Sequence, residues 1–130
     1  DGIVEAGTEA GIPEFAVEKA EAATDAFADA FEHAREAGVD VAMGTDAGTP
    51  FNHLADAPEE LQLMVEYGLS PREALEAATV NAADLLGLDD VGLVEAGYRA
   101  DLVVLDSNPL EDPAAWESPA HVVAAGTISR

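Results

Sequence analysis

The chain has 130 residues, and its 27 Asp or Glu against five Lys or Arg give a formal net charge of −22 at pH 7. Because 48% of the residues are apolar, we expect a folded core under an acidic surface and not a disordered acidic tail. No basic patch is available to bind nucleic acid, and no apolar run is long enough to cross a membrane. We therefore expect neither nucleic acid nor a membrane as a partner.

The composition also bears on the cellular compartment. The absence of cysteine removes disulfides and thiolate metal sites, and it fits a reducing, cytoplasmic environment. The chain begins with Asp1 and carries no secretory leader, which we expect of a processed chain or a fragment. An acidic, lysine-poor surface is typical of a salt-rich cytoplasm, where ions screen the repulsion between like charges.

The first part of the chain predicts a helix followed by a strand. Apolar residues at helical spacing predict a long helix over residues 14–37, with Gly38 in the left-handed position after its end. Residues 39–43 form a short β-prone run that predicts a strand, and residues 44–50 are small and turn-forming. This order is typical of a parallel α/β layer.

Two further helices have clear start signals. Asp56 followed by Glu59 predicts a capping box, and Ser70 followed by Glu73 predicts another, with proline at the first helical position. These helices are expected to end at Gly68 and Gly87. The buried face of the second is predicted to consist of Leu75, Ala78, Ala82, Leu85 and Leu86.

The remainder of the chain is β-rich. Strands are predicted over residues 91–94 and 102–105, followed by a loop and a final hairpin around Gly126. We therefore expect a boundary near Asp89, which divides the chain into residues 1–88 and residues 89–130.

Asp46 is the strongest candidate for a functional residue. It follows the predicted strand directly, and in parallel α/β folds ligand-binding groups gather at the carboxyl ends of strands. A carboxylate at a buried strand end requires a cation or hydrogen-bond donors. Alternatively, Asp46 only closes its own turn with backbone donors. From position alone both interpretations stay open.

His53 and Thr49 are candidates for substrate contact in the same loop. A histidine there could bind metal, move a proton or touch substrate, but a solvated side chain is the simpler interpretation. Thr49 could contact substrate or bond only to its own backbone. The sequence contains no nucleophile elbow, P-loop or His-Glu-x-x-His motif, and one aspartate cannot hold a catalytic zinc, which takes three protein ligands.

Three segments in order resemble the amidohydrolase superfamily, in the imidazolonepropionase-like branch that includes metal-dependent dipeptidases. They are residues 37–48 with Gly-Thr-Asp, residues 68–83 with the two closing helices, and residues 92–106. The resemblance implies an α/β fold: the C-terminal part of a (β/α)8 TIM-like barrel, followed by strands of a small β-sandwich.

The resemblance also implies a role for Asp46. It corresponds to the aspartate after the eighth barrel strand, which binds or faces the metal and takes a proton from the attacking water. The metal would be divalent, zinc in the first instance, with one or two ions in the full-length enzyme. The family's other ligands, a His-x-His pair, a lysine and two further histidines, have no counterpart in this chain.

The implied activity is hydrolysis of C–N bonds in amides, peptides or cyclic amides, on a small-molecule or dipeptide-like substrate, when the upstream barrel strands are present. The alternative is a non-catalytic C-terminal structural or assembly module. A strand at residues 39–43 with unpaired edges would also promote association, so a homo-oligomer is a further expectation.

Overall fold

The computed structural model describes residues 2–49 and 53–129. The helices are α1 (Gly2–Ala6), α2 (Glu14–Glu36), α3 (Ala57–Glu66), α4 (Pro71–Ala78) and α5 (Val80–Leu86), with 3-10 turns η1 (Thr8–Ala10), η2 (Leu54–Asp56) and η3 (Pro113–Glu117). The strands are β1 (Leu102–Val104), β2 (His121–Ala124) and β3 (Thr127–Ile128). None of the helices in the described part of the chain is long and apolar enough to span a bilayer.

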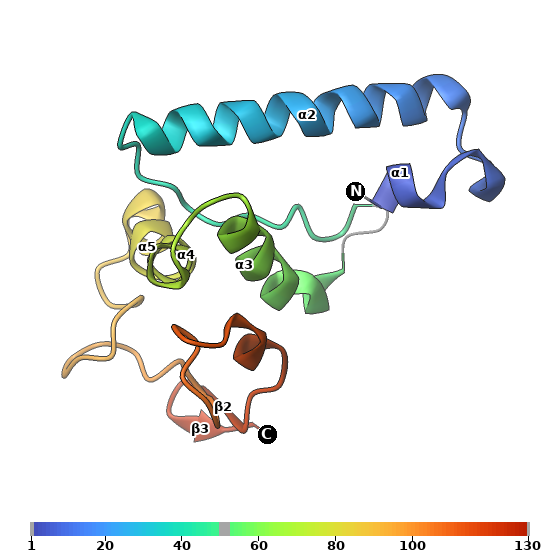
Figure 1. Ribbon diagram of the computed structural model, residues 1–130. Coiled ribbons are helices and arrows are strands. Elements are labelled where there is room, and N and C mark those ends of the chain that lie inside the picture. The colour runs from blue at the N-terminus through green and yellow to red at the C-terminus, as the bar shows by residue number, and fades with distance from the viewer. Residues whose placement is uncertain (1, 50–52, 130) are drawn as a thin grey trace.

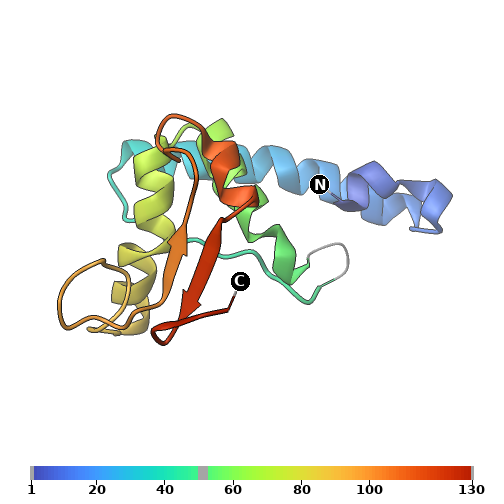
Figure 2. The same cartoon turned by 90° about the horizontal axis from the view of Figure 1, so that it is seen from below.

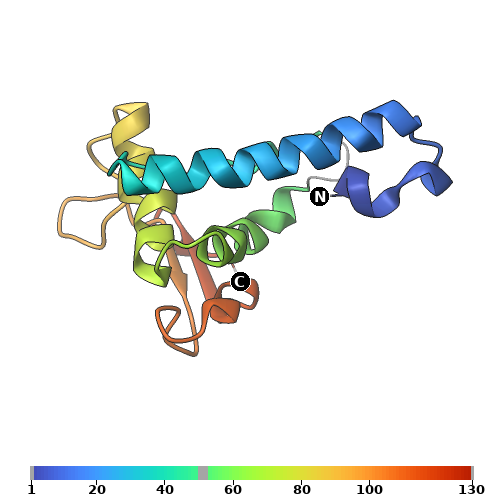
Figure 3. The ribbon, with the colours of Figure 1, turned by 45° about the horizontal axis from the view of Figure 1, so that its top comes forward.

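The long predicted helix is confirmed as α2. It lies along one side of the molecule, and its N-terminal half extends beyond the other elements together with α1 (Figures 1 and 3). Its apolar stripe is covered only in part, because Phe31 packs against the core whereas Phe15 and Phe27 are 71% and 59% exposed. The sequence pattern therefore identified the helix, but part of its apolar face stays exposed to solvent.

The core lies where α3, α4 and η3 meet the segment after α2. Its buried members are Met64, Leu69, Ala74, Ala77 and Trp116, with Val41, Met43 and Leu105 among the half-buried residues packed against them. Trp116 belongs to the β-rich part of the chain, so this part contributes to the same core as the helices. Figure 2 shows the small sheet beside α3 and α4. The boundary near Asp89 stays a prediction.

The predicted strand over residues 39–43 is not formed in the described chain. This segment runs between α2 and α3 (Figure 1) without a strand beside it. The Met43 amide donates to the carbonyl of Ala77 at 3.0 Å, and the Asn81 side-chain amide donates to the carbonyl of Val41 at 2.9 Å. A β-prone run becomes a strand only when a neighbouring strand completes its hydrogen bonds.

The two predicted capping boxes differ in outcome. At α4 the Glu73 amide donates to Ser70 Oγ at 3.2 Å, and the Ser70 amide donates to Glu73 Oε2 at 2.7 Å, so this box is confirmed. The box between Asp56 and Glu59 is wrong, because Asp56 Oδ2 accepts from the His53 amide at 2.6 Å instead. A 3-10 turn before α3 thus moves this cap three residues toward the N-terminus.

The helix expected to run from Ser70 to Gly87 breaks in two. Thr79 separates α4 from α5 with φ −126° and ψ −84°, and its hydroxyl donates to the carbonyl of Leu75 at 2.7 Å. The break changes the direction of the chain between α4 and α5. Leu85 and Leu86 are 76% and 70% exposed, so the prediction that they belong to a buried face is wrong. The helix still ends at Gly87, which has φ 66° as predicted.

The C-terminal part forms an antiparallel sheet in the order β1-β2-β3. Leu102 pairs with Val123, and the predicted hairpin turns through Ala125 and Gly126, with φ 49° and 78°. Successive positive φ angles are the geometry of a tight type I′ hairpin. The strand predicted over residues 91–94 is wrong, because this stretch consists of bends and an irregular residue.

Candidate functional site

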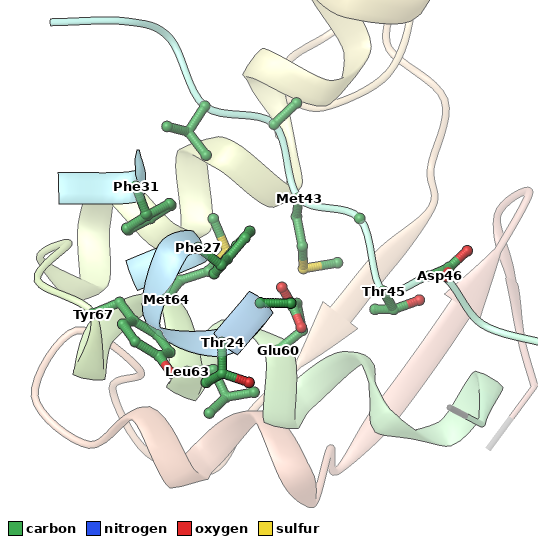
Figure 4. A pocket seen from close by; sticks show the side chains of 14 residues that line it. Thr24, Phe27, Phe31, Met43, Thr45, Asp46, Glu60, Leu63, Met64 and Tyr67 are labelled. Carbon is green, nitrogen blue, oxygen red and sulfur yellow. The ribbon is translucent and has the colours of Figure 1, made fainter. Parts of the chain in front are cut away.

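An open pocket of about 870 Å³ lies between α2, the segment after it and α3. It is lined by Ala23, Thr24, Phe27 and Phe31 of α2, by residues 41–46, and by Glu60, Leu63, Met64 and the adjacent Tyr67. Three aromatic rings gather on one side, with centroid distances of 6.1 Å between Phe27 and Phe31, 6.3 Å between Phe27 and Tyr67 and 6.4 Å between Phe31 and Tyr67. The pocket wall is therefore mostly apolar (Figure 4).

Asp46 lies at the far end of this pocket from the aromatic rings (Figure 4). Its φ of 51° is in the left-handed region, which aspartate tolerates better than most residues other than glycine. The Thr49 amide and hydroxyl donate to the backbone carbonyl of Asp46 at 3.3 and 2.9 Å. The turn is thus closed by the backbone oxygen of Asp46, and its exposed carboxylate is not used for that purpose.

The other two predicted site residues do not line the pocket. Thr49 and His53 are both exposed, and they flank residues 50–52, which lie outside the described part of the chain. His53 makes a backbone hydrogen bond to Asp56 at 2.6 Å, which helps to start the 3-10 turn before α3. The structure therefore brings only Asp46 of the three predicted residues to the pocket.

The described residues do not by themselves fit a catalytic metal ion. Over residues 2–49 and 53–129, no group of three or more His, Cys, Asp or Glu side chains could hold one. A catalytic zinc takes three protein ligands and keeps one open position. Asp46 is a single oxygen ligand, so a metal centre at this end of the pocket would need ligands from elsewhere.

Glu60 is a pocket residue that the sequence analysis missed. It is half-buried on α3, and desolvation by burial, assisted by the negative charge of Glu59, raises the pKa of its carboxyl above the ordinary value. The signal was present, because Glu60 precedes Leu63, Met64 and Tyr67 at helical spacing on the same face. A carboxyl on an apolar face either has a hydrogen-bonding or charged partner or lowers the stability of the fold.

The helix that leads into a Gly-Thr-Asp loop, the paired helices and the small antiparallel sheet together superimpose on a segment of a solved amidohydrolase structure. The model of the "Amidohydrolase family" matches residues 3–128, and the chain belongs to this family. The resemblance found in the sequence to the imidazolonepropionase and dipeptidase branch is confirmed by individual relatives.

Three relatives illustrate this similarity. An imidazolonepropionase from Rubrobacter xylanophilus is 49% identical over 74 residues, which is 55% of this chain and 18% of that protein. A crystal structure of a proposed prolidase from Bifidobacterium longum superimposes with a TM-score of 0.88 at 41% identity, covering 94% of this chain and 31% of the other. A Xaa-Pro dipeptidase with methionine bound in its active site has a TM-score of 0.82 at 35% identity, covering 92% and 29%. This chain thus spans less than a third of each relative.

Proposed function

We propose that this chain is the C-terminal part of a metal-dependent amidohydrolase that hydrolyses C–N bonds in amides, peptides or cyclic amides. The family membership and the names of the relatives support hydrolysis of such bonds, and the bound methionine in one relative supports a dipeptide-like substrate. The observation that carries the proposal is the exposed carboxylate of Asp46 at the pocket end, in a turn where, among the described residues, Thr49 donates to the backbone oxygen of Asp46.

In this proposal residues 39–43 form the eighth strand of a (β/α)8 barrel. Residues 1–88 are the end of the barrel, and residues 89–130 contribute to a small β-sandwich. The anchoring of Val41 and Met43 to α4 and α5 supports a fixed position for the segment, and its lack of a neighbouring strand is what a partial barrel would show. Since this chain covers 31% of one solved relative, the missing strands would lie in the uncovered part.

The chemistry proposed for this chain's own residues is limited to Asp46, Thr49 and His53. A divalent metal such as zinc, one or two ions per full-length enzyme, would lower the pKa of a bound water. Asp46 would contribute a carboxylate oxygen to the metal site and would accept a proton from the attacking water at that carboxylate. Thr49 and His53, at the two ends of the stretch that follows, would contact the substrate. The remaining metal ligands would come from the uncovered part, so this chain alone would be inactive.

The full-length enzyme is further proposed to work in a salt-rich cytoplasm. The cysteine-free composition supports a cytoplasmic location, and the charge of −22 supports a salt-rich one.

The test is a matched pair of variants in the longer reading frame that contains these residues. Asp46→Asn should lower turnover of dipeptides by about 10²–10⁴-fold, the contribution typical of a positioned acid or base. Asp106→Asn removes the same charge from an exposed position in the β-rich part and should leave turnover unchanged. Metal analysis of chelator-free protein should find about one or two ions per chain. Equal turnover in both variants would contradict the role of Asp46.

The second candidate is a non-catalytic C-terminal module. Both candidates expect no metal-binding group among the described residues, so its absence there does not separate them. The upstream reading frame separates the two candidates, because the enzyme requires a His-x-His pair, a later lysine and two further histidines there. A frame without them, or a long chain that binds no metal, would leave the module as the function.

A further inference from the structure

The segment that leads to Asp46 is held to the paired helices by two hydrogen bonds. From α5, the Asn81 side-chain amide donates to the carbonyl of Val41 at 2.9 Å. On the α4 side, the Met43 amide donates to the carbonyl of Ala77 at 3.0 Å. The paired helices thus hold the segment at two points that lie two residues apart in the sequence.

Asn81 provides one of these two points with its side chain. It lies in the first turn of α5, although asparagine is a weak helix former because its side chain competes for nearby backbone groups. Its amide instead reaches a carbonyl 40 residues earlier in the sequence. Asn81 and Val41 are both half-buried, and polar groups shielded from water need a partner within the protein. A leucine has a similar size but has no donor for this carbonyl.

A small cleft of about 290 Å³ lies beside this contact. Its wall includes Val41 and Asn81, together with the charged residues Arg35, Asp40 and Glu73. A cleft of this size with polar walls has room for water. Water can therefore reach the carbonyl of Val41 when the Asn81 donor is removed, so the fold should persist while the segment loses one of its two fixed points.

Asp46 lies shortly after the second fixed point. Only two residues, Gly44 and Thr45, separate it from Met43 (Figure 4). Three residues of chain span at most about 10 Å, so a shift of the segment is passed directly to Asp46. Within the described residues, the hydrogen bonds that Asp46 accepts come from Thr49 in its own turn. The position of this turn relative to the helices therefore depends on the fixed points that precede it.

We propose that Asn81 is a positioning residue for the hydrolysis: by holding Val41, it fixes the place and direction in which Asp46 presents its carboxylate. The inference rests on the proposed function, which assigns proton acceptance to Asp46. A misplacement of about 1 Å can lower the rate of a reaction by about a hundredfold, so loss of the donor should act on kcat. The competing interpretation is that Asn81 only satisfies the carbonyl of Val41 and has no effect on Asp46.

A double-mutant cycle separates the two interpretations. In the longer reading frame used for the Asp46 variants, Asn81→Leu should lower kcat for dipeptides by about 10–100-fold and leave KM nearly unchanged. In an Asp46→Asn background, Asn81→Leu should have little further effect, because the carboxylate that Asn81 positions is absent. Asn81→Asp keeps the shape and loses the donor, and a carboxylate is favourable in the first turn of a helix, so this second variant should fold and give the same pattern.

Hydrogen exchange tests the contact without turnover or metal. Asn81→Leu should speed exchange of the Met43 amide by about 3–10-fold, the factor that corresponds to one lost hydrogen bond in the same segment. Gln62→Leu is the matched control, because the Gln62 side-chain amide donates to Glu117 Oε1 at 2.7 Å and joins α3 to η3 instead. This control should change neither the exchange of Met43 nor kcat.

Each result has a distinct meaning. Unchanged exchange at Met43 in Asn81→Leu would show that Asn81 does not hold the segment. An unchanged kcat, or an equal loss of kcat with Asp46 and with Asn at that position, would show that Asn81 does not act through the carboxylate. Either result overturns the positioning role and leaves the proposed function in place. Full turnover in the single variant Asp46→Asn would refute the proposed role of Asp46 and the positioning role with it.

Discussion

Replacement of Gly92 by alanine provides a quantitative test of how the two parts of the chain pack together. Gly92 has φ 92°, and a Cβ atom there would lie 3.0 Å from the carbonyl oxygen of Thr79 and 3.2 Å from the Cβ of Ala83. The left-handed backbone costs an alanine about 1–2 kcal/mol. The contact with Thr79 adds a further cost of about 1–3 kcal/mol, because it is made to backbone at the break between α4 and α5 and cannot be relieved by a side-chain rotation.

The expected loss of unfolding free energy for Gly92→Ala is therefore about 2–5 kcal/mol, the sum of both costs. Gly97→Ala is the matched control, because Gly97 has φ 102° but no atom within 4 Å of its added Cβ. It should lose only the backbone cost of about 1–2 kcal/mol. Urea unfolding followed by the fluorescence of Trp116, which is 8% exposed, measures both. Equal losses in the two variants would refute the close approach of Gly92 to Thr79.

Two further predictions concern charge. The hydrogen bonds from the Ser70 side chain and backbone lower the pKa of Glu73, so this carboxylate stabilises the fold above its unfolded pKa, and that contribution is lost as pH falls through its folded pKa. Ser70→Ala should therefore reduce stability at neutral pH and flatten the acid limb of a thermal pH profile; an unchanged profile would contradict the capping box. Because the net charge is −22, the unfolding midpoint should rise between low and molar salt, and a flat or falling midpoint would contradict the proposed salt-rich environment.

Several elements could be predicted because their signals are local. Ser70 and Glu73 lie three residues apart, Gly87 accepts the left-handed conformation at the end of α5, and the turn at Gly126 follows directly from its neighbours. The turn that holds Asp46 is local in the same sense, because small and turn-forming residues indicate it. The sequence left open whether the Asp46 side chain closes its own turn, and in the structure the backbone carbonyl of Asp46 accepts from Thr49.

Other features depend on contacts between distant parts of the chain. The break at Thr79 lies where Gly92 approaches from a later loop, and residues 72–86 contain neither a proline nor a glycine to indicate it. The exposure of Leu85 and Leu86 follows from that break. Glu60 was overlooked because its own helix does not bury it; the segment that includes Met43, across the pocket, also forms its surroundings.

The sequence by itself determined the left-handed glycines after α2 and α5, the capping box at Ser70, the hairpin and the family, since each depends on residues close together or on an ordered set of motifs. Only the tertiary structure decided that residues 39–43 have no neighbouring strand within residues 2–49 and 53–129, that Trp116 joins the core of the helices, and that Glu60 faces an apolar pocket. The physical reason is that strand pairing and burial are properties of two surfaces in contact. The second surface is not encoded next to the first.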